Sequence, residues 1–272
     1  MATAFSENLT AEQQSQVLQL FQQFQHPTLQ KDLIELKTLK KVEKGGDVLR
    51  IELQLPFAWN TGVEQVKQQL SDALLKATDS KEIKWVVNYQ IATLKRANNQ
   101  PAVKGVKNII AVTSGKGGVG KSSVSVNLAL ALQAQGARVG ILDADIYGPS
   151  IPHMLGAPHQ RPTSPDNQHI TPIKAHGLSA NSIGFLMDED NATIWRGPMA
   201  SSALSQLLNE TLWDSLDYLV IDMPPGTGDI QLTLSQQIPV TGAVVVTTPQ
   251  DIALLDAVKG ASMFERVSVP VL

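Results

Sequence analysis

The stretch that most constrains the fold is residues 109–123, where an apolar run, a glycine-dense loop and a helical pattern follow one another. Residues 109–113 are apolar or β-branched and predict a short buried strand, and Val124, Leu128 and Ala131 then recur at helical spacing. Between these elements, residues 115–122 match the pattern Gly, four residues, Gly-Lys-Ser. In a strand–loop–helix context, this pattern is typical of phosphate-binding loops.

The residue types of this loop suit a polyphosphate. Gly117, Gly118 and Gly120 can adopt backbone angles closed to other residues, so that N–H groups can approach an anion. The helix that begins near Gly120 directs its positive end at the same place. We expect Lys121 to reach the β- and γ-phosphates of ATP and the Ser122 hydroxyl to bind Mg²⁺. The residues expected to contact the nucleotide are Gly115, Lys116, Gly117, Gly118, Val119, Gly120, Lys121, Ser122 and Ser123.

Two further apolar runs end in carboxylates. Residues 138–142 lead into Asp143 and Asp145, and residues 218–221 lead into Asp222. In open α/β sheets, side chains beyond the carboxyl ends of strands line the ligand crevice. We therefore expect Asp222 and Asp143 to support Mg²⁺ and the loop after Asp222, residues 223–229, to sense the γ-phosphate. Helix capping by the Asp143–Asp145 pair remains an alternative.

Alternating strand and helix patterns organise the rest of this half. Residues 242–247 predict a strand, 251–264 a helix and 269–272 the start of another strand. The fold class we predict is α/β, a doubly wound and mostly parallel sheet of a P-loop NTPase, preceded by a small α+β domain.

The N-terminal third forms the predicted α+β domain. Thr10 and Gln13 form a capping-box pattern before a first amphipathic helix. Residues 48–55 alternate as a strand with a hairpin partner at 39–43, residues 63–77 predict a second helix, and 83–89 another strand. We place this domain at residues 1–95, a polar linker at 96–107, and the P-loop ATPase domain at 108–272.

Composition limits the classes of function. The chain has 272 residues, 43% of them hydrophobic and 17% charged, with a net charge of −3 that argues against general binding to nucleic acid or anionic membranes. No apolar run approaches a membrane span, and the N-terminus lacks an export-signal pattern, so we expect a cytoplasmic protein. The chain contains no cysteine, which excludes disulfides and thiolate ligands within these residues.

Two family resemblances sharpen these expectations. The second lysine of the loop, Lys116, resembles the deviant Walker A motif of the SIMIBI-class ATPases, which include MinD, ParA and the nitrogenase iron protein. Residues 116–122, 143–150, 195–199 and 222–229 together resemble the Mrp/ApbC family. The resemblance implies an ATP-sandwiched homodimer in which Lys116 reaches the partner subunit's nucleotide, and it implies that Asp145 orients the attacking water, so that Lys116 and Asp145 are the expected catalytic residues.

The same resemblance implies an ATP-hydrolysing carrier that binds a [4Fe–4S] cluster and passes it to apo-proteins, with scaffold proteins as further partners. In that family a Cys-x-x-Cys pair downstream of residue 272 holds the cluster. We therefore expect this sequence to be truncated at its C-terminus and the cluster to occur only in the complete protein. The N-terminal domain resembles a small metal–sulfur cluster assembly domain, but its passage at residues 56–59 carries no cysteine, which favours docking or regulation.

Several alternatives remain open at this stage. A MinD/ParA-like positioning ATPase would act by reversible surface binding, and a metabolic ligase or kinase could share the fold. His153, His159, His169 and His176 have spacings that fit no metal-ligand pattern. The acidic run at residues 188–191 is most simply a solvated turn. Arg196 is either a phosphate or partner contact or a structural residue.

Overall fold

The computed structural model describes residues 3–97, 100–186, 197–226 and 228–272. The chain divides into two compact units, Met1–Ala92 and Thr93–Leu272. The first unit therefore ends slightly before the predicted boundary at residue 95. Part of the predicted linker belongs to the second unit, because Ala97 N donates to Val240 O and Val103 is buried in that unit's core.

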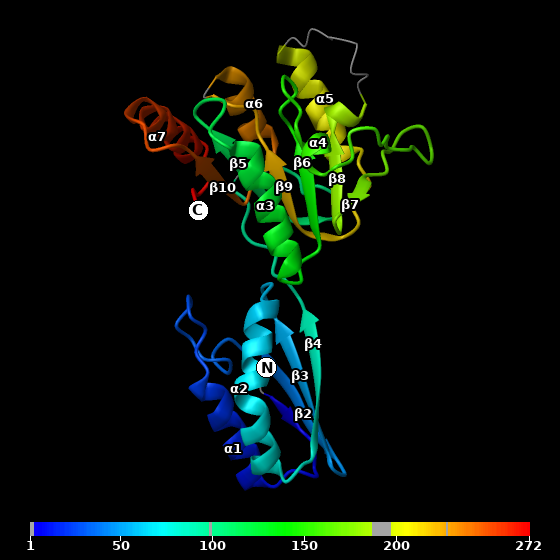
Figure 1. The fold of residues 1–272 in the computed structure, drawn as a ribbon, viewed down its shortest axis with the longest axis vertical. Helices are drawn as coiled ribbons and strands as arrows, with labels where there is room; N and C mark the ends of the chain where they lie inside the picture. Colours follow the sequence, from blue (N-terminus) through cyan, green and yellow to red (C-terminus); the bar gives the residue numbers. More distant parts are fainter. Residues whose placement is uncertain (1–2, 98–99, 187–196, 227) are drawn as a thin grey trace. The chain divides into compact units, whose positions relative to one another are not determined.

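The first unit is a four-stranded sheet with two helices (Figure 1). Its elements are β1 (Ala4–Phe5), α1 (Ala11–Gln23), β2 (Leu39–Gly45), β3 (Val48–Leu55), α2 (Asn60–Thr78) and β4 (Glu82–Tyr89). The strand order is β1-β2-β3-β4, with β2 and β3 antiparallel and the other two pairs parallel. The predicted hairpin and both predicted helices are present, whereas the two-residue β1 carries no alternation and was not predicted.

Local sequence explains how the first unit is built. Thr10 caps α1 through its hydroxyl, and the Gln13 side chain accepts a hydrogen bond from the Thr10 N–H, which confirms the predicted capping box. Alternate residues of β3 are buried at one face of the sheet, where side chains of both helices pack on them. The buried residues of β3 are Leu49, Ile51, Leu53 and Leu55.

The second unit is built around a six-stranded sheet in the order β10-β5-β9-β6-β8-β7. Its strands are β5 (Val106–Ser114), β6 (Val139–Asp143), β7 (Ile173–Ala175), β8 (Leu178–Ser182), β9 (Leu216–Asp222) and β10 (Gly242–Val246). Its helices are α3 (Lys121–Ala134), α4 (Ile151–Met154), the 3₁₀ turn η1 (Ile183–Phe185), α5 (Gly197–Asn209), α6 (Asp229–Gln237) and α7 (Asp251–Arg266). Only the β7–β8 pair is antiparallel, so the predicted mostly parallel sheet is confirmed.

Helices cover both faces of this sheet, as a doubly wound fold requires. Ile109 and Ala111 of β5 share a core with α5, α6 and α7. Ile110, the residue between them on β5, points to the opposite face of the sheet. On the helix-covered faces, α3 lies against β5, β6 and β9 (Figure 1). After α7 the chain returns to the sheet, where Val271 pairs in parallel with Ala243 of β10.

The strands β7 and β8 were not predicted. Every residue of β8 is buried, although Ser179, Asn181 and Ser182 are polar. Their hydrogen bonds lie within the protein: Asn181 donates to the Thr211 hydroxyl, and Ser182 donates to Asp143. The acidic run at 188–191 and Arg196 lie outside the described residues. No helix in the part of the chain that the structure describes has the length and hydropathy to span a bilayer.

Candidate functional site

The glycine loop connects β5 to α3, as the sequence predicts. Gly118 and Gly120 have φ angles of +77° and +90°, in the left-handed region that favours glycine. A Cβ atom added at Gly117, Gly118 or Gly120 would meet no atom within 4 Å. The loop therefore leaves open space beside its backbone at the start of a helix, which is the arrangement that phosphate groups require.

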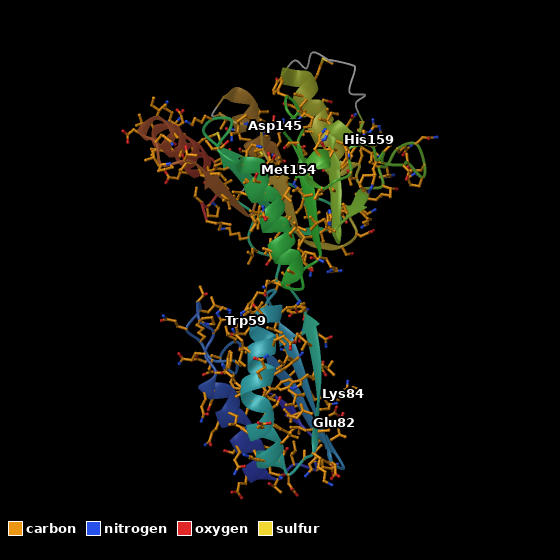
Figure 2. The ribbon with its side chains drawn as sticks, in the orientation of Figure 1. Trp59, Glu82, Lys84, Asp145, Met154 and His159 are labelled. Carbon is orange, nitrogen blue, oxygen red and sulfur yellow. The ribbon has the colours of Figure 1, made fainter. Side chains whose placement is uncertain are left out.

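Lys121, the first residue of α3, is held by two carboxylates, one at the end of β9 and one in the loop after β6. Its Nζ lies 2.8 Å from Asp222 Oδ2 and 3.6 Å from an oxygen of Asp145. The Lys121 side chain is only 7% exposed and that of Asp222 is fully buried. A buried ammonium is stable only when paired, so the contact neutralises charge that the fold has removed from water. Asp145 lies beside the beginning of α3 (Figure 2).

Two hydroxyls of α3 complete the contacts of Asp222. Ser122 Oγ donates to Asp222 Oδ2 at 2.6 Å, and Ser125 Oγ lies 2.6 Å from Asp222 Oδ1. A serine hydroxyl and a carboxylate are ligands that Mg²⁺ prefers, so Ser122 and Asp222 fit the predicted metal site. Sequence reasoning missed Ser125. Its position four residues after Lys121, on the same face of α3, is the signal that would have found it.

Asp143 makes structural contacts that the sequence did not reveal. Its carboxylate accepts hydrogen bonds from the backbone N–H groups of Asp145, Ser150 and Ile151 and from the Ser182 hydroxyl, at 3.0–3.1 Å. Burial and the nearby Asp222 carboxylate raise the pKa of Asp143 to about 7, although these donors favour the ionised form. Through these hydrogen bonds, Asp143 holds the loop after β6 in place, and its support of Mg²⁺ stays a prediction. One of these donors, the Ile151 N–H, belongs to the first residue of α4.

Asp145 remains available for chemistry. Its side chain is 13% exposed and faces Lys121. Burial raises the pKa of the Asp145 carboxyl above its ordinary value, although the Lys121 ammonium acts in the opposite direction. A carboxylate with a raised pKa at the edge of a phosphate site is suited to orient a water molecule and accept its proton.

The loop after β9 is tied through the backbone to Ser114, the residue of β5 that directly precedes the glycine loop. Gly226 N donates to Ser114 O at 2.9 Å, and Ser114 Oγ donates to Lys116 O at 2.8 Å. Within α6, the Gln231 side-chain amide donates to the Thr113 hydroxyl. The predicted γ-phosphate-sensing loop is therefore held against the end of the strand from which the glycine loop starts.

Lys116, a predicted site residue, and the histidines, which were not predicted to bind a metal, form no common cluster in the described part of the chain. Lys116 is half-buried and has no ion-pair partner in the described part of the chain. His169 pairs with Asp166, and His176 Nε2 lies 3.1 Å from Leu155 O. Across the described residues, no group of three or more His, Cys, Asp or Glu side chains could hold a metal ion.

Comparisons with known proteins place this geometry in context. Residues 105–272 match the family model described as ParA, NUBPL iron-transfer P-loop NTPase. An iron–sulfur cluster carrier protein of Haemophilus influenzae is 91% identical over all 272 residues, which cover 74% of that relative. A protein of the same name from Salmonella typhimurium is 68% identical over 249 residues, covering 92% of this chain and 68% of that one.

One solved structure is similar in both sequence and fold. It is a nucleotide-binding protein from Archaeoglobus fulgidus in complex with ADP, which is 39% identical and has a TM-score of 0.54. The match covers 62% of this chain and 65% of that chain.

Proposed function

The chain belongs to the family of iron-transfer P-loop NTPases that includes the iron–sulfur cluster carrier proteins, and from this premise we propose that it binds and hydrolyses Mg²⁺–ATP to drive the transfer of iron–sulfur clusters to apo-proteins. Nucleotide hydrolysis in general follows from membership of the family. ATP as the nucleotide, and its coupling to cluster transfer, are the proposal.

One observation carries the nucleotide part of the proposal. Lys121, Ser122 and Asp222 lie within hydrogen-bonding distance of one another beside a loop whose glycines leave open space. A buried lysine paired with a strand-end aspartate is a costly arrangement for a purely structural role. It is the arrangement expected in a nucleotide-free site, where the ammonium and the carboxylate pair with each other until the phosphates and Mg²⁺ bind.

Each residue has a defined task in the proposed reaction. The nucleotide with Mg²⁺ would supply the phosphoanhydride bond and the electrophilic phosphorus. Lys121 would exchange Asp222 for the β- and γ-phosphates, and Ser122 and Asp222 would hold the metal ion. Asp145 would orient the attacking water and accept its proton, while Asp143 keeps the Asp145 loop in place through its hydrogen bonds to residues 145–151.

The cluster is the cargo. The 272 residues contain no cysteine and therefore offer no thiolate ligand, so the steps of cluster transfer do not follow from these residues. Apo iron–sulfur proteins and scaffold proteins are the proposed partners, in the cytoplasm, with no nucleic-acid or membrane partner. We also propose a homodimer in which Lys116 contacts the nucleotide of the partner subunit.

The positioning ATPase that the sequence left open is disfavoured. The relatives at 91% and 68% identity are named iron–sulfur cluster carriers, and they match this chain over both of its units. The ligase or kinase alternative would need substrate-binding residues between positions 150 and 215, and residues 187–196 of that stretch lie outside the described part of the chain.

The test separates binding from hydrolysis. Titration calorimetry with Mg²⁺–ATP should give saturable binding, and phosphate release should follow. Asp145→Asn should retain binding and lose most of the turnover, on the order of 10²-fold or more if the carboxylate acts as a general base. Asp214→Asn, at an exposed carboxylate paired with Lys174, is the matched control and should change neither. Unchanged turnover in Asp145→Asn would remove the assigned role of Asp145, and the absence of any nucleotide binding would remove the proposal.

A further inference from the structure

Gln231 is a buried polar side chain that has no task in the proposed reaction. It belongs to the first turn of α6, is only 2% exposed, and donates through its side-chain amide to the Thr113 hydroxyl of β5. Thr113 is fully buried as well. Two apolar side chains of the same shape would fill this space without taking polar atoms out of water, so packing alone does not explain the pair.

The amide oxygen of Gln231 has no partner. Among the described residues, the buried side-chain atoms without a hydrogen-bond partner are Ser150 Oγ and Gln231 Oε1. The two atoms lie just after the two loops that the proposed function places beside the phosphates, the loop of Asp145 and the loop that follows β9. A buried acceptor without a donor lowers stability, so its presence points to a functional constraint on the segment that carries it.

The segment that joins β9 to α6 is attached to three consecutive residues of β5, at positions 112–114. The backbone N–H groups of Met223 and Gly226 donate to carbonyl oxygens of this strand, each at 2.9 Å. Gln231 makes the third attachment, to Thr113, through its side chain. Because β5 runs directly into the glycine loop, these attachments fix where the loop after β9 lies relative to the phosphate-binding loop.

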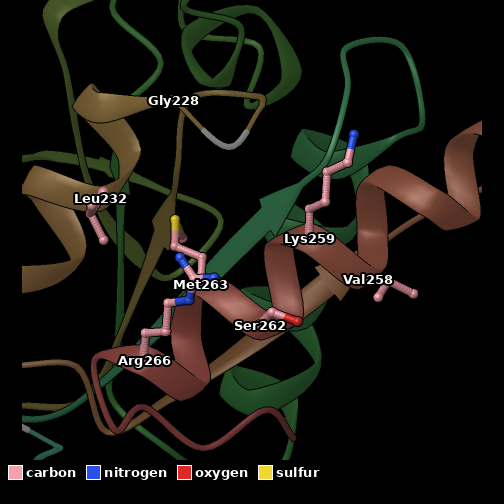
Figure 3. Close-up of a pocket in the computed structure, with 7 residues that line it drawn as sticks. All are labelled: Gly228, Leu232, Val258, Lys259, Ser262, Met263 and Arg266. Carbon is pink, nitrogen blue, oxygen red and sulfur yellow. The ribbon is translucent and has the colours of Figure 1, made fainter.

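The first turn of α6 is not fixed by α7. A groove of about 400 Å³ separates this turn from α7, with Gly228 and Leu232 on one wall and Met263 on the other (Figure 3). On its other side α6 packs on α5. Within the described residues, the side-chain hydrogen bond that attaches the first turn to the sheet is therefore that of Gln231.

We propose that Gln231 is a positioning residue for nucleotide hydrolysis. Its bond to Thr113 fixes the start of α6, and with it Gly228, on one side of the loop after β9, while Gly226 fixes the other side. The inference rests on the proposed function, in which this loop senses the γ-phosphate. Thr113 lies outside residues 115–123, which would contact the nucleotide, so loss of the bond should slow hydrolysis and leave the binding of Mg²⁺–ATP unchanged.

A hydrogen bond suits this task better than an apolar contact does. It fixes direction as well as distance, because its strength falls steeply when the donor and the acceptor are misaligned. Hydrolysis depends on groups that are held in place before the transition state forms. A small displacement of the loop should therefore lower the rate more than it lowers affinity, and this justifies a polar pair that costs stability.

Two substitutions that keep the shape of each side chain test the proposal. Gln231→Met and Thr113→Val together remove the hydrogen bond and the unpartnered oxygen, so the melting temperature of the double variant should equal or exceed that of the wild type. Its kcat for phosphate release should nevertheless fall about three- to tenfold, while the calorimetric Kd for Mg²⁺–ATP should stay within about twofold of the wild-type value.

Three single variants serve as controls. Thr113→Val alone leaves the whole Gln231 amide without a partner, so it should be less stable than the double variant. Thr113→Ser keeps the hydroxyl and should retain the wild-type kcat. Ser235→Ala removes another buried hydroxyl of α6, one that donates to the backbone oxygen of Gln231, and should also leave kcat unchanged.

The outcomes separate this proposal from the proposed function. A wild-type kcat in the double variant would remove the role of Gln231 and leave the ATPase function intact. A fall in kcat with an equal loss of ATP affinity and of thermal stability would also remove it, because a residue that only supports the fold changes all three. Absence of phosphate release by the wild type would remove the proposed function, and the role of Gln231 with it.

Discussion

The two units bury different kinds of polar groups. In the described part of the first unit, the buried polar residues are His26, Thr38 and Thr78, and none is a carboxylate or an amine. Both threonine hydroxyls donate to backbone carbonyls four or five residues away. The second unit buries Lys121, Asp143, Asp217 and Asp222, whose partners lie up to about a hundred residues away in the chain. The difference shows that the second unit buries ionisable groups that a hydrophobic core does not need.

The two ends of strand β9 make the same contrast within one unit. At its beginning, Asp217 is held by Lys107 and Arg138. Burial acts to raise the pKa of Asp217, but hydrogen bonds from these two cations lower it overall. At its end, Asp222 shares one lysine with Asp145 and relies on two hydroxyls. Asp217 is therefore neutralised by two protein cations of its own, whereas Asp222 shares its single lysine with a second carboxylate.

Of the changes that probe this difference between the two units, Lys121→Ala should have the largest effect on stability and on nucleotide binding. It leaves Asp222 and Asp145 without their cation, so the second unit should lose about 3–5 kcal/mol of stability, and Mg²⁺–ATP binding should fall below detection. The unfolding transition of the first unit should not move. Differential scanning calorimetry and titration calorimetry measure these effects.

The matched control for Lys121→Ala is Lys174→Ala, which breaks a surface ion pair with Asp214 and should cost no more than about 1 kcal/mol. Normal nucleotide affinity in Lys121→Ala would mean that the buried lysine is structural after all.

Ser125→Ala should have an intermediate effect. Ser125 does not face the open loop, but it holds Asp222 Oδ1 and thereby positions the carboxylate. Hydrogen bonds to charged groups contribute about 1.5–3 kcal/mol, so the Mg²⁺ concentration needed for half-maximal ATP binding should rise roughly 10- to 100-fold. A merely structural serine would lower stability without changing the Mg²⁺ requirement.

Ser235→Ala is the control for Ser125→Ala. Ser235 is equally buried and donates to the backbone of its own helix, and among the described residues no hydrogen bond joins it to a carboxylate. Ser125→Thr keeps the hydroxyl and should recover most of the Mg²⁺ affinity. If the Ser125 and Ser235 variants shift the Mg²⁺ requirement equally, Ser125 does not position Asp222.

A change of pH should have the smallest effect of the three, and it should act on the stability of the first unit. Burial lowers the pKa of His26 below 6.5, and its Nδ1 accepts hydrogen bonds from the N–H groups of Thr28 and Leu29. Its ring also packs on Phe57 and Trp59. Above pH 6.5 the imidazole is neutral in both folded and unfolded chains. Below pH 6.5, His26 of the unfolded chain takes up a proton before His26 of the folded chain does. The stability of the first unit should therefore fall as the pH decreases towards the pKa of His26 in the folded chain.

Urea unfolding followed by tryptophan fluorescence, at about pH 7.5 and about pH 5.5 on either side of the ordinary histidine pKa of 6.5, measures this loss. His26→Asn removes the titrating group and should flatten the dependence, whereas His159→Asn, at an exposed position of the second unit, should not. An unchanged pH dependence in His26→Asn would exclude His26 as its source.

The parts of the site that the sequence predicted correctly are those encoded locally. The glycine loop lies between a strand and a helix that are adjacent in the chain, so residues 109–123 carry the whole signal. The ends of β6 and β9 were found because an apolar run stops at a carboxylate. These patterns require no knowledge of what lies across the sheet.

The parts that the sequence did not reveal depend on distant partners. The strand β8 is buried but polar, because Asn181 and Ser182 bond to Thr211 and Asp143, so it has no apolar run. Ser125 gains its role only from the position of Asp222, and Asp143 only from the fold of the loop at 145–151. Periodicity detects an apolar face, whereas a buried hydrogen-bond network leaves no such period.

The hydrogen bond from Gly226 N to Ser114 O joins the loop after β9 to the strand residue that precedes the glycine loop, through main-chain atoms alone. Alanine scanning leaves both atoms in place, so a side-chain survey of either loop would miss this link altogether. Replacing the amide at position 226 by an ester would remove the N–H donor and keep every side chain. Such a replacement would thus isolate the contribution of this one backbone hydrogen bond to the coupling between the loop after β9 and the glycine loop.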